Sequence, residues 1–423
     1  MRGHSSVENL RASIVGQRVF LALLALVLAN QIGFGLVIPV LPAYAKSFGL
    51  GAADIGFVIA IYGLARFVAN VPVGQLAERF GRRHVIILGT AITSIASALI
   101  ATAGSLPELL AYRFLAGLGA ATVLTSGQIM VGDLATPENR GRMISTYQGF
   151  LLVGISLGPL PGGLLADWWG LRAPFVAYAI FSALACVFAF LLIRETRPVP
   201  TSAEVAAAAS IVGDVERSRV FTIVRSRAFL LVGFVTFSQF FARTGAIFAI
   251  VPLLGHDRFQ MTASRLGAAQ TLITALNLAL VYFSGSLADR FGRKVVIAPA
   301  TIASGLALLM WAWSPSEYFY FASAAMWGLG AGLAGPAPAA YIADLAPTVV
   351  RARVFAYWRS VSDGGYVVGP ILMGFLAERA GYDLPLVMTG AIIAISGVAF
   401  WLFAPEFHRG TRVSTTGEAP ARP

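Results

Sequence analysis

The sequence is poor in charged residues, cysteine and histidine, and each shortage excludes something. Charged residues make up 12% of the 423 residues, whereas soluble domains carry about 25%, so a water-soluble globule is excluded. Cys186 is alone, so no intrachain disulfide can form. The four histidines show no metal-ligand spacing, and no P-loop motif G-x-x-x-x-G-K-[ST] is present. We therefore expect no metal site, no cofactor and no direct use of ATP.

Long apolar runs dominate what remains. Apolar residues make up 57% of the chain, and a membrane-spanning helix needs about 20 of them in a row. The runs lie at 19–45, 54–77, 84–104, 107–133, 142–166, 172–193, 228–254, 264–288, 295–313, 317–345, 353–377 and 383–404. The first run is long enough to be a retained span rather than a signal peptide. The sequence therefore predicts an all-α membrane protein with twelve transmembrane helices.

A polar gap at 194–227 divides these runs into two sets of six. We expect residues 1–193 to form one bundle, 194–227 a cytoplasmic linker and 228–423 a second bundle with a tail at 405–423. The Ala-rich middle of the linker suits a short surface helix. Residues 1–18 suit either an amphipathic surface helix or a basic arm.

The formal net charge of +11 is compatible with nucleic-acid binding, but the placement of the charges gives another reading. Most of the 31 Lys and Arg residues fall in the segments that lie on one side if the N-terminus is inside. This asymmetry accounts for the basic balance without nucleic acid. We expect a multi-pass protein of the cell membrane, surrounded by lipid, with both termini in the cytoplasm.

The two sets of six runs are related by an internal repeat. The stretch GQLAERFGRR at Gly74–Arg83 returns as GSLADRFGRK at Gly285–Lys294. The same offset places Asp133 on Asp344, Gly158-Pro159 on Gly369-Pro370, and Ala166-Asp167 on Ala377-Glu378. Two six-helix halves in parallel register predict a binding site between them, near the middle of the bilayer.

The repeated stretch resembles the signature loop between helices 2 and 3 of the major facilitator superfamily, and the likeness extends over nearly the whole chain. Glu78 stands where Asp is more usual, and the second copy has Asp289. The resemblance implies two pseudo-symmetric bundles, alternating access and a loop that stabilises the outward-facing state. The residues predicted to form this lock are Gly74, Glu78, Arg79, Gly81, Arg82, Asp289 and Arg293.

Physical chemistry supports such a lock. Glycine has no Cβ, so Gly74 permits close helix approach and Gly81 a tight turn. The Glu78 carboxylate can pair with the neighbouring arginines or with the positive N-terminus of a nearby helix. The alternative is a plain turn with positive charge on the cytoplasmic side.

The fifth run carries small residues at helical spacing, at Gly154, Gly158, Pro159, Gly162 and Gly163. They form a smooth face for close packing, and the proline permits a bend. This pattern resembles the motif of the superfamily's antiporters and favours export over uptake; generic small-residue packing is the alternative. The segment also fits the nucleophile pattern G-x-S-x-G, but no strand precedes it and no acid or histidine is evident beside Ser156. An enzyme is therefore not expected.

Few charges fall inside the runs. Asp363 is the one acid clearly in mid-span, one turn after Arg359 and at a depth similar to that of Arg66; Arg243 is a further base. Because a charge in a span is costly, each is a functional candidate. We expect Asp363 to pair with Arg66 or Arg359 and to serve proton coupling, with a static ion pair as the alternative. Arg113 resembles the superfamily's helix 4 arginine, which implies proton coupling; snorkelling to the surface is the alternative.

Polar and aromatic residues near these charges are candidates for the wall of a substrate cavity. They are Asn30, Gln31, Tyr62, Tyr147, Gln239, Phe240, Asn277 and Trp358. For Asn30 and Gln31 the alternative is a polar bridge between two helices. The predicted function is a proton-coupled antiporter that exports hydrophobic, drug-like compounds as a functional monomer, driven by the proton gradient. A symporter or facilitator for a sugar or an organic anion is the alternative, and a membrane enzyme or receptor is a more distant one.

Overall fold

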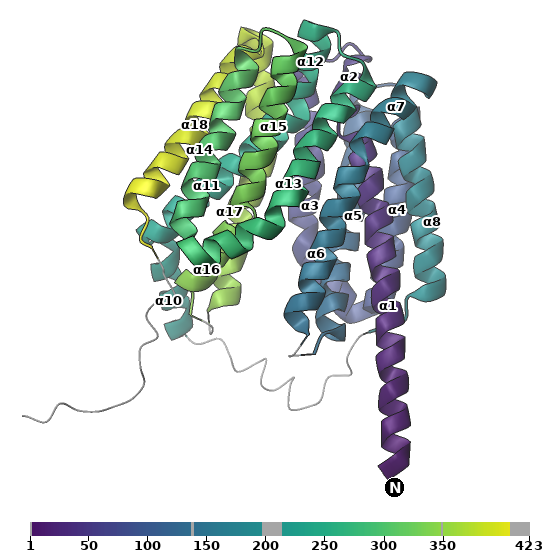
Figure 1. The fold of residues 1–423 in the computed structure, drawn as a ribbon. Helices are drawn as coiled ribbons and strands as arrows, with labels where there is room; N and C mark the ends of the chain where they lie inside the picture. Colours follow the sequence, from purple (N-terminus) through teal and green to yellow (C-terminus); the bar gives the residue numbers. More distant parts are fainter. Residues whose placement is uncertain (1, 137–138, 197–213, 348–349, 407–423) are drawn as a thin grey trace, which may run out of the picture.

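The computed structural model describes residues 2–136, 139–196, 214–347 and 350–406, and these parts contain helices and no strand (Figure 1). The first half begins with α1 (Arg2–Val37), followed by the short α2 (Leu41–Lys46). The helices that follow are α3 (Ala52–Phe80), α4 (Arg82–Thr102), α5 (Leu106–Leu134), α6 (Arg140–Leu157), α7 (Pro159–Trp169) and α8 (Ala173–Leu192).

The second half repeats this order. The short helix α10 (Asp214–Val224) precedes α11 (Arg227–Ala242), a π-helix η1 (Arg243–Ile250) and α12 (Val251–Phe259). The remaining helices are α13 (Ala263–Phe291), α14 (Arg293–Ala312), α15 (Glu317–Ala334), α16 (Ala337–Leu345), α17 (Arg351–Ala380) and α18 (Asp383–Phe403). The Ala-rich middle of the linker lies outside the described residues.

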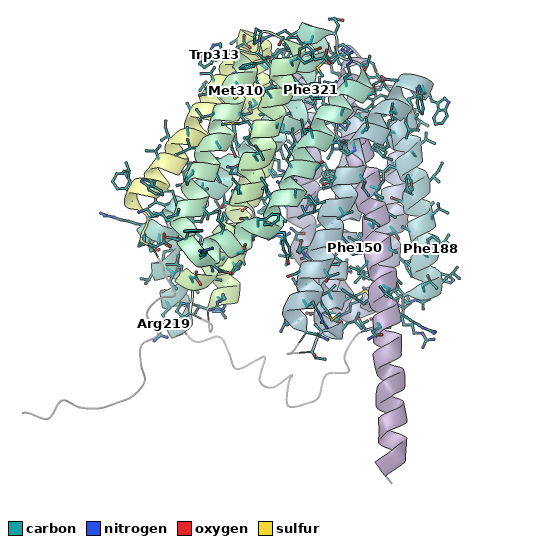
Figure 2. All side chains as sticks on the ribbon, viewed as in Figure 1. Phe150, Phe188, Arg219, Met310, Trp313 and Phe321 are labelled. Carbon is teal, nitrogen blue, oxygen red and sulfur yellow. The ribbon has the colours of Figure 1, made fainter. Side chains whose placement is uncertain are left out.

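Eleven helical segments of the described residues are long and apolar enough to cross a membrane. The expected span at 317–345 is the one missing, because it is divided between α15 and α16 at Gly335 and Pro336. Large apolar side chains cover the outer surface, as membrane immersion requires. Phe188 and Trp313 project outward from the bundles (Figure 2) and are 56% and 66% exposed.

Three predicted spans depart from straight helices. We expected one helix over 19–45, but α1 ends at Val37 and a new helix starts at Leu41. Pro39 lies between them, since proline lacks the N–H that would continue the helix. The fifth span changes from α6 to α7 at Gly158, just before Pro159. The seventh contains the π-helix η1, which we did not predict from the apolar run at 228–254.

The two bundles meet at one end and diverge toward the other, where the N-terminus lies (Figure 1). We call the end where the bundles meet the closed end. We call the other the loop end, because the repeated loops with Gly81 and Gly292 lie at that end. Two pairs of helices carry most of the contact between bundles, α3 with α17 and α7 with α13. The backbones of the two bundles approach each other very closely at these contacts. A Cβ at Gly56 would lie 2.2 Å from the carbonyl oxygen of Pro370, and one at Gly163 would lie 2.2 Å from that of Ala263.

A different glycine, Gly162, packs α7 against α1 inside the first bundle, and this contact generates a stability prediction. A Cβ at Gly162 would lie 2.1 Å from the carbonyl oxygen of Leu36. Overpacking of this kind costs about 1–3 kcal/mol, so Gly162→Ala should lower the thermal unfolding midpoint of the purified protein. Gly149→Ala is the matched control, because a Cβ there has nothing within 4 Å. Alanine is the better helix former by about 1 kcal/mol, so the control should hold or raise the midpoint. Equal midpoints for the two variants would contradict the close packing.

Candidate functional site

Two carboxylates fasten the bundles together at the closed end. Asp167, near the end of α7, accepts hydrogen bonds from the backbone N–H groups of Ala263 (2.9 Å) and Ser264 (3.0 Å), where α13 begins. Glu378, near the end of α17, accepts one from the N–H of Ala53 (2.9 Å), where α3 begins. A carboxylate at a helix N-terminus satisfies free N–H groups and complements the helix dipole. Each bundle thus caps one helix of the other.

An ion pair adds to this fastening. Lys46 of α2 pairs with Asp257 of α12 in the other bundle, and Asp257 also accepts a hydrogen bond from the hydroxyl of Tyr382. Burial, together with the bond to Asp257, raises the pKa of Tyr382, so its phenol stays protonated and remains a donor. We refer to Asp167, Glu378 and the Lys46–Asp257 pair as the closed-end clasps.

At the loop end, each bundle has a matching charged cluster of its own. Nε of Arg82 lies 2.9 Å from Oδ2 of Asp133, and the Arg82 N–H donates to Glu195 at 2.9 Å. In the second bundle, Nε of Arg293 lies 3.2 Å from Oδ2 of Asp344. The N–H of Arg293 donates to Glu406 at 2.9 Å. These clusters join helices of one bundle and do not cross to the other.

The turn glycines of the loops are required by this arrangement. Gly81 has φ of 92° and Gly292 has φ of 97°, a left-handed region that strains other residues. A Cβ at Gly81 would also lie 2.3 Å from Oε2 of Glu195. The tight turn predicted for Gly81 is therefore present.

The pairing expected for Glu78 is absent from this conformation. Among the described residues, no ion pair within 4.0 Å involves Glu78, which is exposed, because Arg82 turns to Asp133 instead. Its counterpart Asp289 does pair, with Arg293 at 2.6 Å. Arg79 is exposed, with its guanidinium over the ring of Phe80.

Close helix approach at Gly74 is likewise absent from this conformation. A Cβ there would have nothing within 4 Å, and the same holds at its repeat position, Gly285. The physical reason is the separation of the bundles at the loop end, which leaves these faces of α3 and α13 without a neighbour at those positions.

The small residues of the fifth span all face a neighbouring backbone. Gly154 and Gly158 pack on α1, where a Cβ at Gly158 would lie 2.5 Å from Cα of Gly35. Gly162 packs on Leu36, as described above. Gly163 and Pro159 instead contact α13 of the other bundle, at Ala263 and Gly267. The motif therefore serves two interfaces at once, one within a bundle and one between bundles.

Arg113 is buried, which contradicts the snorkelling alternative. It is 5% exposed, and its guanidinium lies 4.6 Å from the ring centroid of Tyr62. Its Nε donates to the carbonyl oxygen of Val58 at 3.3 Å. Tyr62 in turn stacks on Phe34 at 5.5 Å, so α1, α3 and α5 meet around this arginine.

Asp363 makes no direct ion pair here. No partner within 4.0 Å is recorded for it among the described residues, although Arg359 and Arg66 act on it electrostatically. The guanidinium of Arg66 lies over the ring of Tyr366, 5.6 Å from the centroid. The contact expected between Asp363 and an arginine is therefore a longer-range attraction in this conformation.

The predicted wall residues divide into two groups. Asn30 and Tyr147 were expected on a cavity wall, but both are buried inside the first bundle. Asn30 of α1 accepts a hydrogen bond from Tyr178 of α8, which agrees with the alternative of a polar bridge between two helices. Tyr147 packs against Gly127. Tyr62 belongs to the same buried group, since it is 3% exposed and lies beneath Arg113. In the second group, Trp358 donates a hydrogen bond to Thr236 at 3.0 Å. The partly exposed ones are Gln31, Gln239, Phe240, Asn277 and Trp358.

Sequence reasoning missed the carboxylates that carry most of these contacts. Asp167 and Glu378 are repeat partners, and Glu195 and Glu406 stand at the same offset just after the sixth and twelfth spans. Extending the repeat comparison past the last span of each half would have paired Glu195 with Glu406. Acids that recur at helix ends are a usable signal for capping.

Two six-helix bundles that are fastened at one end and separate at the other define a membrane transporter fold. The chain belongs to the major facilitator superfamily, whose family model matches residues 23–276 and again 232–423. It is 30% identical over 310 residues to "Tetracycline resistance protein, class C" of Escherichia coli, covering 71% of this chain and 75% of that protein. It is 24% identical over 373 residues to "Multidrug resistance protein MdtG" of Klebsiella pneumoniae, covering 86% and 88%.

A solved structure with the same fold is that of a D-xylose-proton symporter. It has a TM-score of 0.71 at 16% identity and covers 92% of this chain and 98% of its own. At that identity the likeness concerns the fold alone.

The closed-end clasps generate a conformational prediction. Asp167→Asn together with Glu378→Gln should shift the equilibrium toward a state with the loop end closed, because each cap is worth about 0.5–2 kcal/mol. Spin labels at positions 144 and 287, in a Cys186→Ser background, would report a larger fraction of short loop-end distances. Glu108→Gln is the matched control, since Glu108 caps only Gly104 of its own bundle. Distances that match the unmodified protein in the double variant would contradict the clasp role.

The Arg82–Asp133 pair generates a second prediction. Both side chains are largely buried, at 10% and 14% exposed, so removing one partner leaves a poorly solvated charge. Arg82→Gln and Asp133→Asn should each lower the free energy of unfolding by about 3 kcal/mol. The double variant should lose less than the sum of the two. Additive losses in a double-mutant cycle would show that the pair is not coupled.

Proposed function

We propose that this chain exports hydrophobic, drug-like compounds across the cell membrane in exchange for protons. The observation that carries the proposal is the arrangement of the bundles, which touch near the closed end through glycine backbones and carboxylate clasps while the loop end is apart. Relatives named for tetracycline and multidrug resistance support drug export. The Gly-Pro motif of the fifth span, which lies on the interface between bundles, supports an antiporter.

We propose that the loop end faces the cytoplasm, with both termini on that side. Arginine and lysine gather there, as the positive-inside rule requires. The conformation described is then inward-open, ready to take a compound from the cytoplasm or the inner leaflet. An unpaired Glu78 agrees with this state, since a lock for the outward-facing state should be undone in it. Residues 1–193 and 228–423 would move as two units, joined by the linker 194–227, in a functional monomer.

Proton coupling is assigned to Asp363 with Arg66 and Arg359, and to Arg113. Asp363 is the acid that arginines of both bundles influence, because Arg66 lies on α3 and Arg359 on α17. When the bundles move, the distance from Asp363 to Arg66 changes, and with it the preference of the carboxylate for a proton. The gradient drives export in this scheme, and no cofactor takes part.

Import of a defined small metabolite by symport or facilitation is the second candidate. The fold alone permits it, since the superfamily includes a D-xylose-proton symporter with this architecture. The antiporter-type packing of Gly158 and Pro159 favours export.

Dye efflux tests the proposal. Cells that express the chain should export amphipathic dyes, and a protonophore should abolish the export. Asp363→Asn should reduce proton-driven efflux by about tenfold or more, because a group that cannot exchange a proton cannot couple to the gradient. Asp54→Asn, a carboxylate in the first turn of α3, is the control. Efflux that survives the protonophore, or unimpaired efflux by Asp363→Asn, would contradict proton coupling through this residue. Dye accumulation in place of export would favour the symporter.

A further inference from the structure

Three arginines gather where α3, α17 and η1 meet. The guanidinium of Arg66 lies 5.6 Å from the ring centroid of Tyr366 on α17, and a Cβ at Gly63 would touch the same ring. Arg243 opens η1, and the next residue, Thr244, donates to the carbonyl oxygen of Tyr366 at 3.1 Å. Arg113 reaches the same group through Tyr62, which lies within electrostatic range of both Arg113 and Arg66.

The group carries an excess of positive charge. None of the three arginines has a carboxylate within 4.0 Å among the described residues, and Asp363 is the acid that acts on Arg66 from a distance. Of the three, Arg66 is the one that Asp363 influences, and Arg359 also acts on that carboxylate. One shared carboxylate cannot balance three guanidinium groups. Arginine does not lose its proton in proteins, so deprotonation cannot relieve this excess. Aromatic faces compensate a buried cation only in part.

The position suits a ligand that comes from the loop end. Contacts between α3 and α17 run from Ala52 and Gly374 at the closed end to Arg66 and Tyr366. Arg66 and Arg243 are both partly exposed, whereas Arg113 is buried. The two partly exposed arginines therefore stand one on each bundle, on the loop-end side of the close glycine contacts, with aromatic rings beside them.

The backbone at Arg243 is unusual in the same place. The eight-residue η1 is a π-helix, a form that is rare and often marks a functional site. Its turns rotate the following side chains relative to an α-helix. The guanidinium of Arg243 lies over Phe248 within this segment, 5.9 Å from the ring centroid.

We infer that the exported compound is an amphipathic organic anion whose carboxylate is held between Arg66 and Arg243. The guanidinium fork matches a carboxylate geometrically, and the neighbouring rings suit an aromatic or apolar body. A bound anion would neutralise the excess charge and join the two bundles through one ligand. This inference rests on the proposed export function and names its substrate class.

A matched pair of dyes tests the inference: a xanthene dye with a free carboxylate and its methyl ester. The full chain in proteoliposomes with an acidic interior should transport the acid faster than the ester by about tenfold, because the acid alone can form charge-assisted hydrogen bonds with the two guanidinium groups. Arg66→Gln and Arg243→Gln should each remove that preference, so that acid and ester move at equal rates, and Arg66→Gln should also slow both dyes because Arg66 is assigned to proton coupling. Arg243→Lys should keep part of the preference. Arg379→Gln is the control, since Arg379 lies over Phe375 at the closed end, away from the group.

The ratio of acid to ester transport rates distinguishes loss of anion binding from loss of proton coupling, because a defect in proton coupling slows both dyes alike. Equal transport of acid and ester by the unmodified protein would overturn the anion site and leave the export function standing. If neither dye moves, the export function fails, and thermal stabilisation of the purified protein decides the anion site. The acid should then raise the unfolding midpoint of the unmodified protein and not that of Arg243→Gln. Stabilisation by acid and ester to the same extent, or of both proteins equally, would overturn it.

Discussion

Close backbone contact between the bundles, confined to one end, is the constraint on which the rest of the structure depends. Glycine makes it possible, because at Gly56, Gly163, Gly267 and Gly374 a Cβ would collide with the backbone of the other bundle. Such backbone contacts fit in one relative position of the bundles only. The interface is therefore either closed or open, and intermediate positions are not favoured. The carboxylate caps of Asp167 and Glu378 strengthen it without bulky side chains. Breaking them exposes polar groups that water at the membrane surface can satisfy, which keeps the cost of opening modest.

The two ends of the molecule use the same chemistry for different purposes. At the closed end, carboxylates cap helices of the other bundle and hold the bundles together. At the loop end, Glu195 and Glu406 cap helices of their own bundle and keep each signature loop rigid. A rigid loop and a separable interface are both needed if each bundle is to rotate as one body.

Much of the fold follows from the sequence, since apolar run length, the polar gap and the repeat register predict the bundles. The breaks and irregular turns within the predicted spans could not be predicted in this way. Pro39 divides the run at 19–45, which was predicted to be one helix. The π-helix η1 packs against α17, a contact that no local pattern encodes. In the candidate site, burial of Arg113 and Tyr147 is a property of three-dimensional packing. The Arg82–Asp133 pair could not be read from local spacing, because Asp133 is far from Arg82 in sequence and near it in space.

The central claim is that the closed end must open during each transport cycle. Cysteines at positions 46 and 257, in a Cys186→Ser background, can be joined by a reversible thiol-specific bridge, because Lys46 and Asp257 pair across the bundles and are partly exposed. Export should stop when the bridge forms and return when it is reduced. Each single-cysteine protein treated in the same way should keep its activity. Undiminished export with the bridge in place would contradict the account.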